Sequence, residues 1–151
     1  MPTTLPVTVQ DGVTDFNAAS VMDNFNYLDD KFPMMEEVSF FIPGNLGVAD
    51  SQVLHYIFGR KVEINSIYAQ VKTAPVTTGI IIEPNRDTTP LATMTIAAGA
   101  NYQQSDYSAD ASRAFSATNY LRIDINQVGT GTVGADLNIV VRFRQYGAND
   151  T

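Results

Sequence analysis

The chain has 151 residues, no cysteine, and nine basic against sixteen acidic residues, which gives a formal net charge of -7. This charge disfavours nucleic-acid binding, because a polyanion is held by basic side chains that displace its counterions. The absence of cysteine excludes a disulfide framework, and a single histidine, His55, excludes a zinc site built from nitrogen and sulfur ligands. At this length we expect one domain.

The sequence contains neither a membrane-spanning apolar run nor the pattern of a secretion signal. Apolar runs such as Gly79–Ile82 are far shorter than the roughly 20 residues that span a bilayer. The N-terminus lacks the basic start and the apolar centre of a signal peptide. We therefore expect no membrane insertion and a protein that is soluble where it is made.

The first 14 residues have the pattern of extended backbone. Leu5, Val7 and Val9 alternate with polar residues, two prolines interrupt the segment, and Asp11-Gly12 is a turn signal. This pattern predicts an arm that leaves the domain. An edge strand of the chain's own domain is the alternative.

A helical pattern follows, beginning at Asp15 or Asn17 and ending before Pro33. Its apolar positions fall at steps of four, three and four residues: Val21, Phe25, Leu28 and Phe32. A helix of about 15 residues is marginally stable alone in water, so its apolar stripe must pack on something. The stripe suits packing on the chain's own sheets and equally suits a bundle of three copies around an axis.

From residue 34 onward the sequence indicates strands and turns. Segments with strand alternation lie at 37–42, 53–58, 62–71, 78–83, 92–96, 120–128 and 137–144. The alternation within 62–71 changes phase at Asn65-Ser66, which a β-bulge would produce. We predict an all-β fold: an antiparallel, jelly-roll-like sandwich of about eight strands over 34–151, preceded by an extended arm and one short α-helix over 1–33.

The last two segments have the clearest alternation. Their inward positions are predicted to be Leu121, Ile123, Ile125, Leu137, Ile139, Val141 and Phe143. The glycine-rich stretch Gly129–Asp136 between them is interpreted as the loop of a hairpin. It matches the Gly-x-Gly-x-x-Gly phosphate signature only superficially, because it joins two strands and precedes no helix.

Residues with catalytic or binding chemistry are few. His55 lies in an apolar stretch and is interpreted as a packed or interfacial histidine. Glu83, Asn85 and Asp87 have the alternating oxygens of a calcium loop but lack the glycine and distal glutamate of an EF-hand. We expect no enzymatic activity, no catalytic residue, no metal and no cofactor.

The polar stretch 99–118 is too long for an ordinary hairpin loop. It carries four side chains that are candidates for an outer contact surface: Tyr102, Asp106, Tyr107 and Asp110. We interpret them as a solvated contact loop. Glycan contact is an alternative, and hydrolysis of a glycan by two carboxylates is disfavoured.

Two parts of the chain resemble virion proteins of tailed bacteriophages. Residues 5–28 resemble an N-terminal segment of such proteins: an extended piece, a turn, and a short helix ending in Asn24-Phe25-Asn26. Residues 120–125, 127–129 and 134–142 look like the jelly-roll domains of head fibres, capsid decoration proteins and tail-fibre tips. The middle of the chain is not covered by the resemblance.

The resemblance implies a homotrimer. On that basis Val21, Phe25, Leu28 and Phe32 are expected at the trimer interface, and Leu5, Val7 and Val9 are expected to contact a neighbouring subunit or the major capsid protein. The short chain favours a capsid decoration, or cement, protein on the virion surface, made in the host cytoplasm. The alternatives are a short tail-fibre or receptor-binding protein that contacts host surface glycans and, less favoured, a free carbohydrate-binding or hydrolytic jelly roll.

Overall fold

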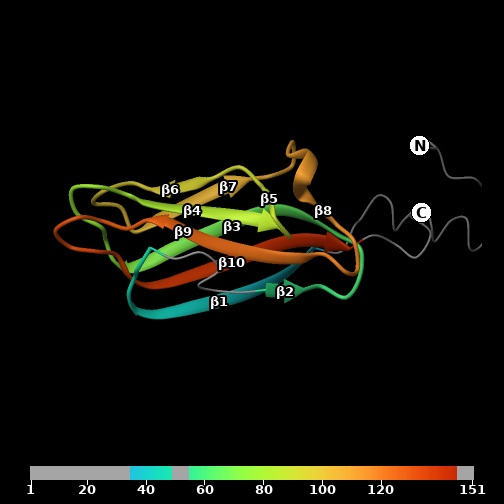
Figure 1. Ribbon diagram of the computed structural model, residues 1–151, viewed down its shortest axis with the longest axis horizontal. Coiled ribbons are helices and arrows are strands. Elements are labelled where there is room, and N and C mark those ends of the chain that lie inside the picture. The colour runs from blue at the N-terminus through green and yellow to red at the C-terminus, as the bar shows by residue number, and fades with distance from the viewer. Residues whose placement is uncertain (1–34, 49–54, 146–151) are drawn as a thin grey trace, which may run out of the picture.

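A computed structural model describes residues 35–48 and 55–145, which form two five-stranded antiparallel sheets (Figure 1). Sheet A contains β1 (Met35–Asn45), β3 (Val62–Thr73), β7 (Tyr102–Asp106), β8 (Ala114–Phe115) and β10 (Ala135–Gln145). Sheet B contains β2 (His55–Ile57), β4 (Ile80–Arg86), β5 (Thr89–Pro90), β6 (Met94–Ile96) and β9 (Tyr120–Gln127). One 3-10 turn, η1 (Ala111–Arg113), precedes β8.

The connectivity is that of a jelly roll. Without the two-residue strands β5 and β8, sheet A has the order β1-β10-β3-β7, and in sheet B β2 pairs with β9, β9 with β4, and β4 with β6. Successive strands lie in alternate sheets except at the centre of the chain, where β4 and β6 share sheet B. This arrangement is two Greek keys wound together. The predicted all-β, jelly-roll-like sandwich of about eight strands is confirmed.

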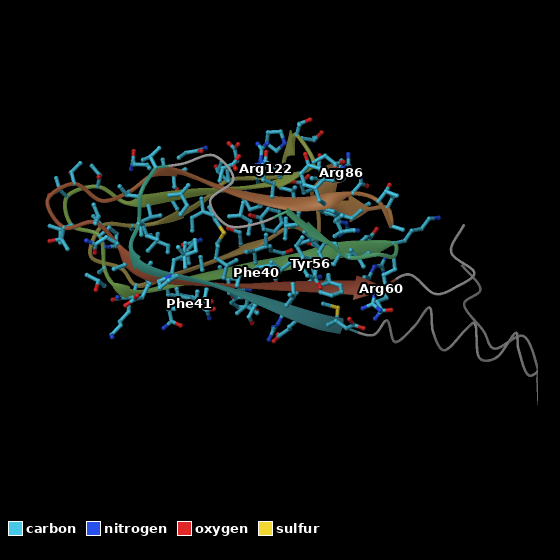
Figure 2. The ribbon with its side chains drawn as sticks, turned by 60° about the horizontal axis from the view of Figure 1, so that its bottom comes forward. Phe40, Phe41, Tyr56, Arg60, Arg86 and Arg122 are labelled. Carbon is cyan, nitrogen blue, oxygen red and sulfur yellow. The ribbon has the colours of Figure 1, made fainter. Side chains whose placement is uncertain are left out.

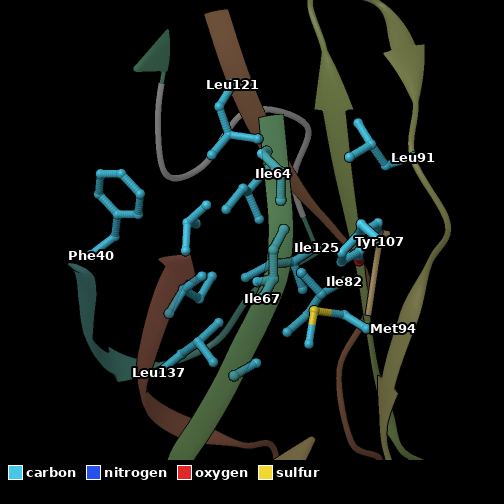
Figure 3. Close-up of a cluster of buried hydrophobic side chains, with 14 of the residues drawn as sticks. Phe40, Ile64, Ile67, Ile82, Leu91, Met94, Tyr107, Leu121, Ile125 and Leu137 are labelled. Atoms are coloured by element: carbon cyan, nitrogen blue, oxygen red, sulfur yellow. The ribbon is translucent and has the colours of Figure 1, made fainter. Parts of the chain in front are cut away.

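The inner faces of the two sheets form one apolar core (Figure 3). All seven positions predicted to point inward in 121–143 are buried. Figure 3 shows Ile64 and Ile67 of β3 beside Ile82 and Ile125 of the facing sheet. Each such side chain contributes about 1.5–3 kcal/mol on burial, so the strand alternation determines which face of each sheet is covered.

Aromatic rings fill one end of this core. The Phe58 ring lies 4.8 Å from Phe143, 5.1 Å from Tyr56 and 5.5 Å from Phe115, measured between ring centroids, and all three pairs are edge-to-face. This geometry is the one that aromatic quadrupoles favour. The cluster joins β2, β8 and β10 where the two sheets meet.

The predicted hairpin of the last two strands is wrong. β9 pairs with β2 and β4 in sheet B, whereas β10 pairs with β1 and β3 in sheet A. The glycine-rich stretch therefore crosses from one sheet to the other, a separation of about 10 Å. A Cβ added to Gly134 would lie 2.4 Å from Ile80 Cδ1, so the crossing passes against the core and a larger residue there would displace the Ile80 side chain. Alternation identifies the buried face of a strand but not its pairing partner.

Two further expectations concern the middle of the chain. The bulge at Asn65-Ser66 is confirmed, because Ser66 pairs with Arg142 and Ile64 with Phe143, leaving Asn65 unpaired on β3. The Asn65 carbonyl instead accepts a hydrogen bond from the Tyr107 amide at 2.8 Å. The stretch 99–118 is not one long loop, since it contains β7, η1 and β8.

The described sandwich begins and ends at the same place, which we call the terminal pole. Met35 is the register partner of Arg144, and Val62 is that of Gln145. Arg144 and Arg113 both contact Glu63, at 2.7 and 3.3 Å, and Arg60 pairs with Glu36 nearby. The opposite end, the distal pole, holds the last residues of β1 and β3 and the first of β10.

Candidate functional site: the outer face of sheet A

The outer face of sheet A carries exposed aromatic rings. Phe41 of β1 is 61% exposed and Tyr102 of β7 is 51% exposed. The register places Asn138 and Gln70 between them in one row across the sheet. In Figure 2, Phe41 lies toward the distal pole and Arg60 lies at the terminal pole.

A hollow of about 380 Å³ opens beside Phe41. Its lining residues come from three strands and define what we call the Phe41 hollow: Phe41, Gln70, Lys72, Asp136 and Asn138. The hollow combines one aromatic ring, two amides, one ammonium group and one carboxylate. These groups can contact a polar ligand that also presents an apolar face.

A second cluster on the same face lies closer to the terminal pole. Arg142 is the register partner of Glu37, donates a hydrogen bond to the Glu37 carboxylate and donates another to the Tyr68 hydroxyl at 2.8 Å. The bond to Glu37 raises the pKa of Arg142. Both members of the ion pair are about half exposed, so solvent screening keeps its contribution to stability small. The cluster fixes the Tyr68 ring on the surface.

The four side chains predicted to form an outer contact loop do not form one patch. Tyr107 is a correction: it is fully buried, and its hydroxyl donates a hydrogen bond to the Ala92 carbonyl at 2.8 Å. Burial raises the pKa of Tyr107. Because its sequence neighbours are polar, Tyr107 was predicted to be a surface residue although it belongs to the core.

The two aspartates of the stretch organise its backbone. Asp106 accepts a hydrogen bond from the Ser108 amide at 2.7 Å, which lowers the pKa of Asp106. Asp110 caps η1 by accepting from the Ser112 amide at 2.7 Å and also accepts from the Ala92 amide at 3.0 Å. Of the two tyrosines, only Tyr102 presents its ring on the outer face of sheet A.

The residues considered as a calcium loop lie at the end of β4: Glu83 and Asn85 are on the strand, and Asp87 is in the turn that follows it. Asn85 is buried in β4 and donates hydrogen bonds to Asp124 at 3.1 Å and to the Glu83 carbonyl at 3.0 Å. Asp87 accepts from the Tyr120 amide at 2.9 Å. Within 35–48 and 55–145, no three His, Cys, Asp or Glu side chains are grouped so that they could hold a metal ion.

Several expectations fall on residues outside the described ranges. The proposed arm residues Leu5, Val7 and Val9 and the helix positions Val21, Phe25, Leu28 and Phe32 all precede Met35. His55 lies on β2, where its backbone pairs with that of Arg122 in sheet B.

Comparisons with known proteins give no family. No protein-family model and no curated protein matches the chain. One similar solved structure is described as "Bacillus endospore appendages form a novel family of disulfide-linked pili", at 13% identity and a TM-score of 0.43, with 76% of this chain and 88% of that chain covered. At this similarity the match assigns neither function nor partner. Among the described residues, no helix is long and apolar enough to cross a membrane.

Proposed function

We propose that the protein is a structural component of a bacteriophage virion, a decoration protein that binds the outer surface of the capsid as a homotrimer and stabilises the shell. The observation that carries the proposal is the shared terminal pole. Because Met35 and Arg144 are neighbours, the segments before β1 and after β10 join the sandwich at one end. In this proposal those segments make the capsid contacts, and the distal pole and the outer face of sheet A are left for other contacts.

The mechanism is adhesive. A protein that binds the assembled shell and not its separated subunits raises the stability of the shell by mass action. In this proposal Leu5, Val7 and Val9 contact the major capsid protein, and Val21, Phe25, Leu28 and Phe32 pack around the three-fold axis. No chemical step is involved. The aspartates at 87, 106, 110 and 124 support this reading, since each has a structural hydrogen-bond partner.

A second candidate is a short tail-fibre or receptor-binding protein. The Phe41 hollow favours it, because an exposed ring beside two amides suits contact with a host surface glycan. This candidate shares the trimer and the virion location with the first. It differs in the partner, which would be the host surface and not the capsid.

The trimer is tested by the mass of the full chain in solution and by the Phe25→Asp variant. Sedimentation equilibrium should give about three times the 16.5 kDa chain mass for the wild type and one chain mass for Phe25→Asp, because a carboxylate cannot be buried at an apolar axis without a partner. The variant Asp23→Asn, on another face of the predicted helix, is the control and should remain trimeric. A wild-type monomer, or a Phe25→Asp trimer, would count against the proposed interface.

A further inference from the structure

The Phe41 hollow exists because β1 bulges where it ends. Ile42 pairs with Leu137 and Asn45 with Ala135, so Pro43 and Gly44 together lie opposite the single residue Asp136. Asp136 has φ 55 and Gly44 has φ 77, both in the left-handed region. A bulge of this kind redirects a side chain, and a non-glycine residue at positive φ is uncommon outside turns and binding sites.

The bulge holds the Asp136 carboxylate at the rim of the hollow. The Gly44 amide donates a hydrogen bond to Asp136 Oδ1 at 2.8 Å, which ties the end of β1 to the start of β10. In the described part of the chain, Oδ2 accepts no hydrogen bond. One carboxylate oxygen is therefore held by the fold while the other remains available to a ligand.

Three further polar side chains face the same space. Asn138 and Gln70 are register partners on β10 and β3, and Lys72 follows Gln70 on the same side of β3. Among residues 35–48 and 55–145, none of these three side chains has a hydrogen-bond or ion-pair partner. Together they offer two amide donors and acceptors and an ammonium donor, beside the carboxylate acceptor.

The charge and shape of the hollow define the ligand. Lys72 and Asp136 cancel, which favours a neutral ligand over a phosphate or a sugar acid. The amides require hydroxyl groups that both donate and accept, and the exposed Phe41 ring requires an apolar C–H face to stack on. The pyranose ring of a neutral hexose has both features. The volume of the Phe41 hollow, about 380 Å³, lies within the usual range for ligand pockets.

We propose that the Phe41 hollow binds one neutral hexose unit of a glycan. Phe41 stacks on the ring, Asn138 and Gln70 bond adjacent hydroxyls, and Asp136 accepts from a third. The inference does not rest on the proposed function, because the hollow belongs to the sandwich alone. Its distance from the terminal pole leaves it accessible in a protein anchored there.

The test uses the full chain labelled with nitrogen-15 and three probes: the methyl glycosides of glucose, galactose and mannose. We expect at least one to shift the side-chain amide resonances of Gln70 and Asn138 and the backbone resonances of Gly44 and Asp136 in a saturable manner. Methyl glucuronide and glucose 6-phosphate should bind more weakly. If no neutral glycoside shifts these resonances, or if an anionic probe binds better, the proposal is overturned.

Variants separate stacking from general surface effects. Phe41→Ala should weaken binding about tenfold, the equivalent of one aromatic contact, and Phe41→Leu should weaken it in the same direction. Ile57→Ala, an exposed apolar residue of sheet B, is the control and should leave the affinity unchanged. If Phe41→Ala does not fold, Asn138→Asp and Gln70→Glu test the same site by changing its two amides. Unchanged affinity in the folded Phe41 variant, or in both of these substitutes, would exclude the site.

The outcome is distinguishable from that of the proposed function. Sugar binding is read at the Phe41 hollow in a soluble protein. Capsid binding is read by sedimentation and depends on residues before Met35. A protein that binds a hexose without binding capsids would retain this inference and lose the decoration role.

Discussion

Met35 and Arg144 are direct register partners, so the first strand and the last strand of the sandwich meet at the terminal pole. The Phe41 hollow lies on the same two strands and β3 but toward their other end. The proposed attachment and the proposed hexose binding would therefore use opposite ends of sheet A.

Tyr107→Phe removes a hydroxyl that donates to the Ala92 carbonyl and leaves that carbonyl without its partner. We expect the free energy of unfolding at pH 7 to fall by about 1 kcal/mol. Urea unfolding followed by circular dichroism measures it. Tyr102→Phe is the matched control, because the Tyr102 hydroxyl bonds to Gln104 on an exposed surface, and it should change stability by less than about 0.5 kcal/mol.

The same tyrosine predicts a pH dependence. Burial raises the pKa of Tyr107 above the ordinary 10.0, so the folded protein holds this proton more tightly than the unfolded chain does. The resulting stabilisation is fully present below pH 10 and is lost as the pH rises above it. The stability difference between the wild type and Tyr107→Phe should therefore shrink between pH 9 and pH 11. A constant difference over that range would show that Tyr107 does not titrate differently on folding.

Gly134→Ala tests the crossing between the sheets. The added methyl group would lie 2.4 Å from Ile80 Cδ1 and 3.4 Å from Leu46 Cδ1, so we expect a loss of about 1–3 kcal/mol from overpacking. Ile80→Val removes the methyl group that clashes. The double variant should therefore lose less stability than the sum of the losses in the two single variants. In a solvent-exposed hairpin loop the alanine would be nearly neutral and no coupling would be found.

Asp124→Ala removes the carboxylate that accepts the hydrogen bonds of a buried polar cluster on sheet B. Asp124 Oδ2 accepts from Asn85 Nδ2 at 3.1 Å and from Arg122 Nη2 at 2.7 Å, and Asp124 is 3% exposed. We expect a loss of about 3 kcal/mol, because two donors lose their partner in a desolvated place. Asn126→Ala, two residues along the same face and exposed, should cost less than about 0.5 kcal/mol. Equal losses in the two variants would contradict the structural role of Asp124.

The sequence predicted the faces of the strands better than their partners. Period-two alternation identified Leu121 and Leu137 as core residues and identified the bulge at Asn65. It could not show that β9 and β10 lie in opposite sheets, since pairing depends on contacts with β1 and β4. A loop that returns and a loop that crosses have the same composition.

The candidate site was less accessible to sequence analysis. Phe41 is out of phase with its apolar neighbours Phe40 and Ile42, which was the available signal for an exposed ring. The left-handed backbone of Asp136 depends on the bulge opposite Pro43 and Gly44, and no local pattern in β10 reports it. Tyr107 was missed for the converse reason, because polar neighbours on both sides make a buried tyrosine look like a surface one.

The most direct test of the proposed decoration role is sedimentation with phage capsids that have been stripped of this protein. The full chain should sediment with the shells and raise their resistance to heating, whereas the chain without Met1–Thr14 should stay in the supernatant while keeping the circular dichroism of the folded sandwich. Phe41→Ala is the control and should sediment like the wild type. Binding that persists without Met1–Thr14, or a full chain that never binds the shells, would contradict the account.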